Sequence, residues 1–243
     1  MTLLVKPLSP ALGAEITGVD LREDLSAETF AEIIDTWHKH LVILFRNQTL
    51  SEDDQIRFAQ RFGALQKRTR PPEAINEAGH TKYPQLTMLV SNIRENGKLI
   101  GSLPDGEMQF HSDQCFLEKP AAGTFLYAIE IPSHGGDTLF LNMYKAYETL
   151  PSELKARVDG RKALYVNRLM TFTIEGMDDE EGSALLNKLF DHIEQDQFIY
   201  AHHWRVGDLI LWDNRCTLHA RTDFSDKERR LLRRYTVSGD RVY

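Results

Sequence analysis

The stretch GDLILWDNRCTLHAR, residues 207–221, carries the pattern that decides the fold class. A short apolar run follows a Gly-Asp pair and ends at an Asp-Asn pair, and a second short run follows at once. Short runs of this kind, bounded by turn residues, predict β-strands joined by tight connections. The flanking stretches QFIYAHHW (197–204) and LLRRYTVSG (231–239) have the same character. The last third of the chain is therefore predicted to be a series of short strands.

The earlier part of the chain combines further strands with a few amphipathic helices. Apolar residues recur at helical spacing over residues 26–41, 51–62 and 178–195, and Ser26 and Ser51 are suitable N-caps. The other predicted strands cover residues 41–46, 86–93, 122–131 and 162–167. Many short strands with few helices predict a mainly β fold, a jelly roll or another closed β architecture with the helices packed outside.

The totals exclude several classes of protein. The chain has 243 residues, which fits a single domain spanning residues 1–243. A formal net charge of −7 argues against a nucleic-acid or membrane-surface binder. Cys115 and Cys216 are too few for a disulfide scaffold, and no apolar segment is long enough for a bilayer span or a secretory signal. We therefore expect a cytoplasmic protein.

A histidine and an aspartate lie two residues apart inside MQFHSDQCF, residues 108–116. On a strand, the side chains of His111 and Asp113 would point to the same face. Burying both there is costly unless they pair with each other or share a third partner. A metal ion is the candidate for that partner.

Two histidines and one carboxylate around a metal with open positions are typical of non-haem iron(II) oxygenases, so a second histidine is expected on another strand. The chain has nine histidines. His219, which follows a strand and an Asp-Asn turn, is the best candidate, although spacing alone does not single it out. His202 and His203 are adjacent, so one of them could face the core, and solvent exposure is the simpler interpretation.

Two arginines stand four residues apart in KERRLLRRYTV, residues 227–237. On a strand, Arg230 and Arg234 share a face with Leu232. Like charges on one face repel unless anions lie beside them, and arginine is the preferred partner of carboxylates. The alternative is a solvated charge cluster, which is the ordinary interpretation of such a run.

These motifs together resemble one family of oxygenases. FHSDQCF (110–116), GGDTLF (135–140), WRVGDLILWDNRCTLHAR (204–221) and RRLLRRYTVSGD (229–240) are similar, in this order, to motifs of the taurine dioxygenase and 2,4-dichlorophenoxyacetate dioxygenase family. The resemblance spans residues 18–241. It implies a double-stranded β-helix of the jelly-roll, cupin-like type. It also implies an enzyme that uses Fe(II), 2-oxoglutarate as cosubstrate and O2, and it suggests ascorbate as a reductant.

The resemblance assigns roles to residues as well. It makes His111, Asp113 and His219 the iron ligands. It places Thr138 and Arg230 at the distal carboxylate of 2-oxoglutarate. It places Arg234 beside the anionic group of the substrate.

The chain departs from the family at two polar positions that contact the substrate in taurine dioxygenase. Arg68 stands near the place of an expected histidine and Glu107 near that of an asparagine, which argues against taurine. Arg68 or Arg70, from a long polar loop, is a candidate to help bind the anion, and the alternative interpretation of each is a solvated loop charge. Glu107 would hold an amine if it faces the pocket. Residues 159–162 stand where the family has a longer excursion. Either the loop is truly short, which would open the pocket, or residues of the excursion are absent from this sequence.

The expected function is hydroxylation of an unactivated C–H bond in a small anionic organic substrate, with release of succinate and CO2. An aryloxyalkanoate-like carboxylate is favoured, and a sulfonate, a sulfate ester or an amino acid is the alternative. Two further function classes stay open, a cupin-like metalloprotein that works without 2-oxoglutarate and a non-catalytic binding protein. We expect a homodimer or homotetramer, and no nucleic-acid or membrane partner.

Overall fold

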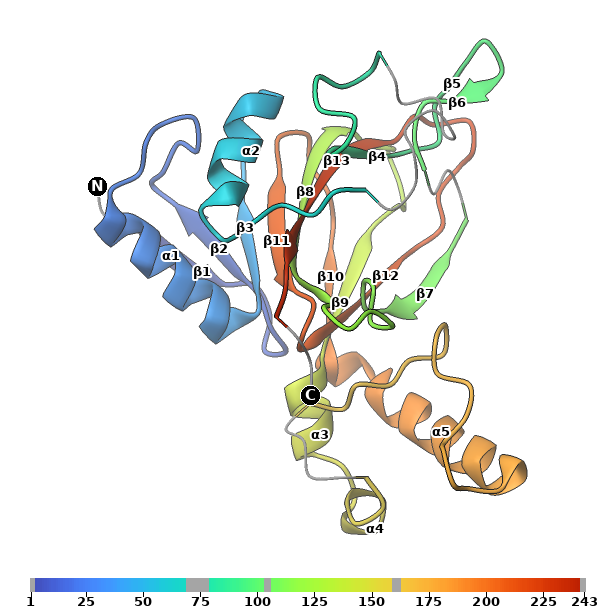
Figure 1. Cartoon of the computed structure of the whole chain (residues 1–243). Coiled ribbons are helices and arrows are strands. Elements are labelled where there is room, and N and C mark those ends of the chain that lie inside the picture. The colour runs from blue at the N-terminus through green and yellow to red at the C-terminus, as the bar shows by residue number, and fades with distance from the viewer. Residues whose placement is uncertain (1–2, 69–78, 103–105, 159–162, 241–243) are drawn as a thin grey trace.

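The computed structural model describes residues 3–68, 79–102, 106–158 and 163–240, which form two facing β-sheets with helices outside them (Figure 1). The larger sheet has the strand order β1 (Leu4–Pro7), β2 (Ala14–Thr17), β3 (Val42–Phe45), β11 (Leu209–Asp213), β8 (Ala121–Glu130), β13 (Leu231–Ser238) and β4 (Met88–Ser91). The smaller sheet has the order β10 (Ile199–His202), β9 (Thr138–Asn142), β12 (Thr217–Arg221) and β7 (Met108–His111). β5 (Arg94–Glu95) and β6 (Lys98–Leu99) form a separate hairpin. The predicted mainly β fold of the jelly-roll type is confirmed.

Successive side chains along each strand point alternately to the two faces of the sheet. This gives an inner apolar core between the two sheets and an outer one on the far face of the larger sheet. In β11, Ile210 and Trp212 point inward and pack with Phe140 of the smaller sheet, while Leu209 and Leu211 point outward. The outward face of the larger sheet is covered by α1 (Ala27–His40) and α2 (Glu52–Gln60). Burial on both faces explains why β11 reads as a continuous apolar run rather than an alternating one.

A third apolar cluster lies on the smaller sheet, where Leu141 and Leu218 pack against helices. These helices are α3 (Met143–Glu148) and α5 (Asp179–Ile193). Two shorter elements, α4 (Ser152–Lys155) and the 3-10 helix η2 (Asp196–Phe198), also contribute apolar residues to this cluster. The central strands of both sheets are thus covered on their outer faces.

Helix starts follow the local sequence closely. The Ser26 hydroxyl accepts a hydrogen bond from the Thr29 amide at the start of α1. Ser51 and Asp54 form a reciprocal capping box at the start of α2. Each predicted helix is therefore confirmed to within about two residues, since caps are set by neighbours in sequence.

Two strand expectations are wrong. The strand predicted over residues 162–167 does not form in its described part, because residues 163–167 carry no ladder hydrogen bonds; the Tyr165 hydroxyl instead donates to the Ser112 hydroxyl. β7 ends at His111, so Asp113 lies in the turn that follows rather than on the strand. In the described part of the chain, no helix is long and apolar enough to cross a membrane.

Candidate metal centre

Two histidines face each other across a pair of neighbouring strands. His111 is the last residue of β7 and lies directly opposite His219 of β12, with ring centroids 4.2 Å apart. The Nδ1 atom of His111 is 2.9 Å from the Gln109 carbonyl oxygen, so it carries the proton and donates it. The Nε2 atom of His111 is then free as a lone-pair donor to a metal.

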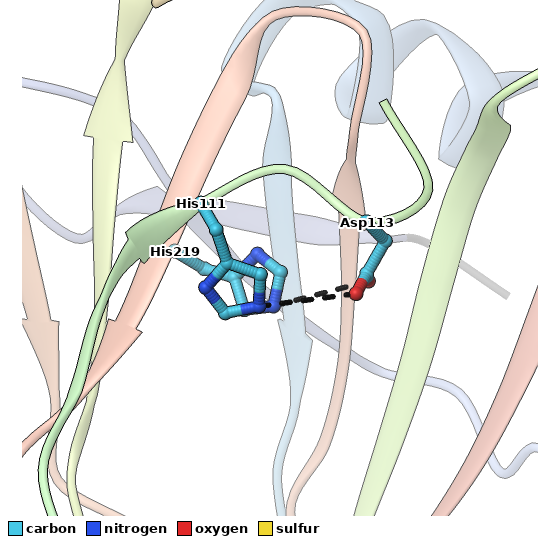
Figure 2. A group of neighbouring side chains, drawn as sticks. All are labelled: His111, Asp113 and His219. Atoms are coloured by element: carbon cyan, nitrogen blue, oxygen red, sulfur yellow. Dashed lines mark ion pairs between the residues drawn. The ribbon is translucent and has the colours of Figure 1, made fainter. Parts of the chain in front are cut away.

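Asp113 completes the group from the turn after β7 (Figure 2). Its carboxylate oxygens lie 4.0 Å from Nε2 of His111 and 3.8 Å from Nε2 of His219. The three ligand atoms lie within 4.8 Å of one another, and all three residues are at least 92% buried. Because β7 stops at His111, the turn rather than the strand pleat brings the carboxylate to the two rings.

The donor set fits a divalent iron. Two neutral imidazoles and one carboxylate form the facial arrangement that non-haem iron(II) sites use. Nδ1 of His219 is buried, and no described atom bonds to it. Burial and the nearby His111 lower the pKa of His219 to about 3, against the opposing attraction of Asp113. The ring is therefore neutral at physiological pH, as metal ligation requires.

A relay of buried hydrogen bonds orients the Asp113 carboxylate. The Thr124 hydroxyl donates to Asp113 Oδ2 at 3.0 Å and accepts from the Asn214 amide at 2.8 Å. The Trp212 indole in turn donates to Asn214 Oδ1 at 2.8 Å. Asn214 is therefore fixed at both ends, and Thr124 has its single proton directed at Asp113.

One cation lies directly against the metal group. Arg234 Nη2 is 2.7 Å from Asp113 Oδ2, and the Arg234 side chain is 12% exposed. Burial opposes ionisation of Asp113, but Arg234, His219 and His111 together hold the pKa of Asp113 well below its usual range. Asp113 is thus a carboxylate over the whole physiological range, whether or not a metal is bound.

A second cation, more completely buried than Arg234, lines the cavity beside the metal group. Arg230 is 2% exposed, and its Nη2 donates to the Gly136 carbonyl at 3.1 Å. Its Nε atom is buried and has no hydrogen-bond partner among the described residues. Burial, with repulsion from Arg221, lowers the pKa of Arg230 to about 9. A buried cation with an unsatisfied donor is a suitable place for the carboxylate of a ligand.

The cavity is lined from both sheets, by a mixture of polar and apolar side chains. Its lining includes His111, His219, Thr138, Arg221, Arg230, Arg234, Val90, Met108, Leu126, Trp212 and Ala220. Arg230 and Arg234 share the inner face, as the spacing predicts, with Leu232 between them in the inner core.

The family model that matches this chain is described as "Taurine catabolism dioxygenase TauD, TfdA family" and covers residues 4–160 and 157–236. The chain belongs to this family. It is a 2-oxoglutarate-dependent dioxygenase, and the buried His-Asp-His group fits the Fe(II) that this chemistry requires.

The chain is similar to three members of the TauD, TfdA family in sequence or structure. The 2,4-dichlorophenoxyacetate dioxygenase of Cupriavidus pinatubonensis is 31% identical, with 100% of both chains covered. A sulfate ester dioxygenase of Pseudomonas putida is 26% identical, covering 99% of this chain and 91% of the relative. The crystal structure of a taurine dioxygenase from Burkholderia xenovorans superposes with a TM-score of 0.82 at 27% identity, covering 98% of this chain and 90% of that one.

The structure brings together six of the residues predicted for the TauD, TfdA site and leaves two apart. The six are His111, Asp113, His219, Thr138, Arg230 and Arg234. Arg68 is not among the cavity-lining residues, and its guanidinium donates to the Thr87 carbonyl at 3.2 Å. Glu107 is exposed and also lies outside the lining. Arg70 and residues 159–162 lie outside the described residues.

Three features of the site were missed from the sequence. Arg221 lines the cavity and could have been found by its spacing, since it lies two residues after His219 on the same strand face. Thr124 gives no sequence signal, because its partner Asp113 lies in the turn after β7, and only the folded structure brings that turn to β8. His202 is fully buried, so the solvent-exposed interpretation of this residue is wrong.

Proposed function

We propose that this dioxygenase hydroxylates a small organic anion, with a carboxylate of the aryloxyalkanoate type favoured as the substrate. The observation that carries this proposal is Arg234, a nearly buried cation on the cavity wall, 2.7 Å from the Asp113 carboxylate. A cation in this place sets the anionic group of a substrate next to the metal group, with the rest of the molecule against apolar lining residues such as Val90 and Leu126. The 2,4-dichlorophenoxyacetate dioxygenase name of a relative with full-length similarity supports the same class.

The metal and cosubstrate roles are assigned as follows. His111, Asp113 and His219 hold Fe(II), with the proton on His111 Nδ1 keeping its Nε2 atom available. Arg230 and Thr138 hold the distal carboxylate of 2-oxoglutarate. When bound, Fe(II) and 2-oxoglutarate with O2 supply the oxidant that hydroxylates the substrate, and succinate and CO2 are released.

The protein's own contribution is to bind and orient the reacting groups and to exclude water from the site. The Thr124 hydroxyl and Arg234 both act on Asp113 Oδ2 and so restrict the rotation of this carboxylate. Val90, Leu126 and Trp212 give the cavity an apolar wall, which protects a reactive site from side reactions with solvent.

The test is a succinate-release screen with 2,4-dichlorophenoxyacetate, its neutral amide, an alkyl sulfate ester, taurine and an amino acid. Arg234→Met should lower kcat/KM for the favoured acid by at least about thirtyfold, because truncating one partner of a desolvated charge pair costs roughly 2–5 kcal/mol. Turnover of the neutral amide should change little. Arg229→Met, at an exposed arginine paired with Glu130, is the matched control.

Two outcomes contradict the proposal. Strong turnover of the amide that does not depend on Arg234 would remove the anion requirement. An equal loss for acid and amide would assign Arg234 to the support of Asp113 instead. A preference for the sulfate ester or taurine that is lost in Arg234→Met would keep the anion contact and move the substrate to the alternative class, which the sulfate ester dioxygenase relative favours.

Several expectations stay predictions. They are a homodimer or homotetramer, a cytoplasmic location, ascorbate as a reductant, and one domain spanning residues 1–243. Equilibrium sedimentation and the dependence of total turnover number on ascorbate test the first and third of these.

A further inference from the structure

The hydroxyl of Thr138 has a dedicated hydrogen-bond donor. Trp204 Nε1 donates to Thr138 Oγ1 at 3.0 Å, and both residues are more than 90% buried. An indole N–H can only donate, so the threonine oxygen must accept. The threonine's own proton is then directed to some other acceptor, and Thr138 lines the same cavity as Arg230.

We propose that Trp204 is a positioning residue that presents the Thr138 hydroxyl proton to the anion held by Arg230. This inference rests on the proposed function, in which Thr138 and Arg230 bind the distal carboxylate of 2-oxoglutarate. Without the indole N–H, the Thr138 hydroxyl can turn and act as an acceptor. It would then place a lone pair rather than a proton beside the incoming carboxylate.

A buried polar cluster holds Trp204 in place. The His202 ring meets the Trp204 ring edge-on, with centroids 4.6 Å apart and an interplanar angle of 89°. His202 Nε2 is 3.1 Å from Asp208 Oδ2, which also accepts from Arg46 Nη1 at 2.7 Å. The Tyr200 hydroxyl lies 3.1 Å from His202 Nδ1, so the ring donates through Nε2 and accepts through Nδ1.

The cluster has a location that suits this role. His202 is paired directly with Thr138 between β10 and β9, while Asp208 precedes β11 and Arg46 follows β3. Asp208 and His202 are fully buried, and the Arg46 side chain is 15% exposed. Holding these polar and charged groups together in the interior costs more free energy than apolar side chains at the same positions would. The arrangement fixes the orientation of the Trp204 ring, which donates its hydrogen bond to Thr138.

The alternative role for Trp204 is simple packing, since it belongs to the inner apolar core. The two roles differ in what happens to ligands with and without a distal carboxylate. Loss of packing would weaken all ligands of the cavity together. Loss of the oriented proton would weaken 2-oxoglutarate but not 2-oxovalerate, which has a methyl group in place of that carboxylate.

The experiment measures binding by titration calorimetry to the Zn(II)-loaded, catalytically silent protein. Trp204→Phe should weaken 2-oxoglutarate roughly three- to tenfold, as expected for one hydrogen bond of about 1 kcal/mol, and leave 2-oxovalerate unchanged. Trp37→Phe is the matched control, because Nε1 of Trp37 is buried with no partner among the described residues. It should change neither ligand.

A double-mutant cycle separates this inference from the proposed function. Adding Trp204→Phe to Thr138→Val should cause no further loss of 2-oxoglutarate affinity. Additive losses, or equal losses for both ligands, would overturn the positioning role. If Thr138→Val itself has no effect on 2-oxoglutarate, the proposed contact of Thr138 is what fails.

A second variant covers the case in which Trp204→Phe unfolds. Incorporation of 3-benzothienylalanine at position 204 keeps the bicyclic shape and removes only the N–H donor. The expected result is the same selective loss of 2-oxoglutarate, and full retention of its affinity would refute the inference.

Discussion

Arg230→Met should make the metal-free protein more stable while it impairs the binding of 2-oxoglutarate. Arg230 is 2% exposed and has no ion-pair partner among the described residues. Its guanidinium is held by the Gly136 carbonyl and lies over the Phe224 ring, with Nε unsatisfied. Methionine is unbranched, fills irregular space and keeps the contact with the ring.

The magnitude follows from the electrostatic cost of the buried charge. A pKa of about 9 instead of the ordinary 12.5 corresponds to roughly 5 kcal/mol of destabilisation of the charged form, at about 1.4 kcal/mol per pKa unit. Losing the bond to Gly136 and leaving its carbonyl without that donor costs about 1–3 kcal/mol. The free energy of unfolding should therefore rise by about 2–4 kcal/mol.

The effect has a defined pH dependence. The folded protein binds this proton less tightly than the unfolded chain, so the cost is fully present below pH 9. It diminishes as the pH rises through about 9, where the folded form can lose the proton. The stability difference between Arg230→Met and wild type should narrow above pH 9.

The assay is denaturant unfolding of the metal-free protein from pH 7 to pH 10, with and without 2-oxoglutarate on the Zn(II)-loaded form. The cosubstrate should stabilise the wild type strongly and the variant little. Arg229→Met is the control, because Arg229 is exposed and should change stability by less than about 0.5 kcal/mol. Clear destabilisation by Arg230→Met, or equal stabilisation of both proteins by 2-oxoglutarate, would refute the reasoning.

Three further substitutions test the geometry of the site. Asp113→Ala should abolish Mn(II) binding in calorimetry while cooperative unfolding is retained, and stoichiometric metal binding by the variant would rule out the ligand assignment. Thr124→Val should weaken the metal roughly tenfold through the Asp113 carboxylate, whereas Thr124→Ser, which keeps the donor, should not. Gly136→Ala should weaken 2-oxoglutarate because its Cβ would lie 3.1 Å from Arg230 Nε; Gly97→Ala, also at positive φ but with nothing within 4 Å, should cost stability alone.

Local features of this fold could be predicted from the sequence. Ser26 and Ser51 mark the starts of α1 and α2, because a cap bonds to an amide three residues away. The inner face of β13, and of Arg230 just before it, follows from the even spacing of Arg230, Leu232 and Arg234. The histidine–aspartate group itself was predicted from residue types and the family resemblance, and its compact arrangement agrees with that prediction.

Features that depend on contacts between distant segments could not be predicted. His202 and His203 carry the same local signal, and the difference between them comes from Asp208, which meets only His202 in the folded core. Asp113 leaves the strand because a turn after His111 brings its carboxylate toward Thr124, eleven residues away in sequence. Neither contact produces a periodic pattern in the sequence from which it could be predicted.

Because of the position of β7, metal binding should affect the stability of the smaller sheet as well as catalysis. β7 is an outer strand of the smaller sheet and is paired with β12 in the described part of the chain. An ion held by His111 and His219 joins these two strands across their ladder, and through Asp113 it also joins the turn beyond. The free energy of metal binding therefore opposes local unfolding of β7 at this edge of the sheet. The effect is measurable as slower amide hydrogen exchange in β7 when the metal is bound than when it is absent. The lifetime of this enzyme under proteolysis should therefore depend on the supply of iron, with the metal-free form cleaved first beside β7.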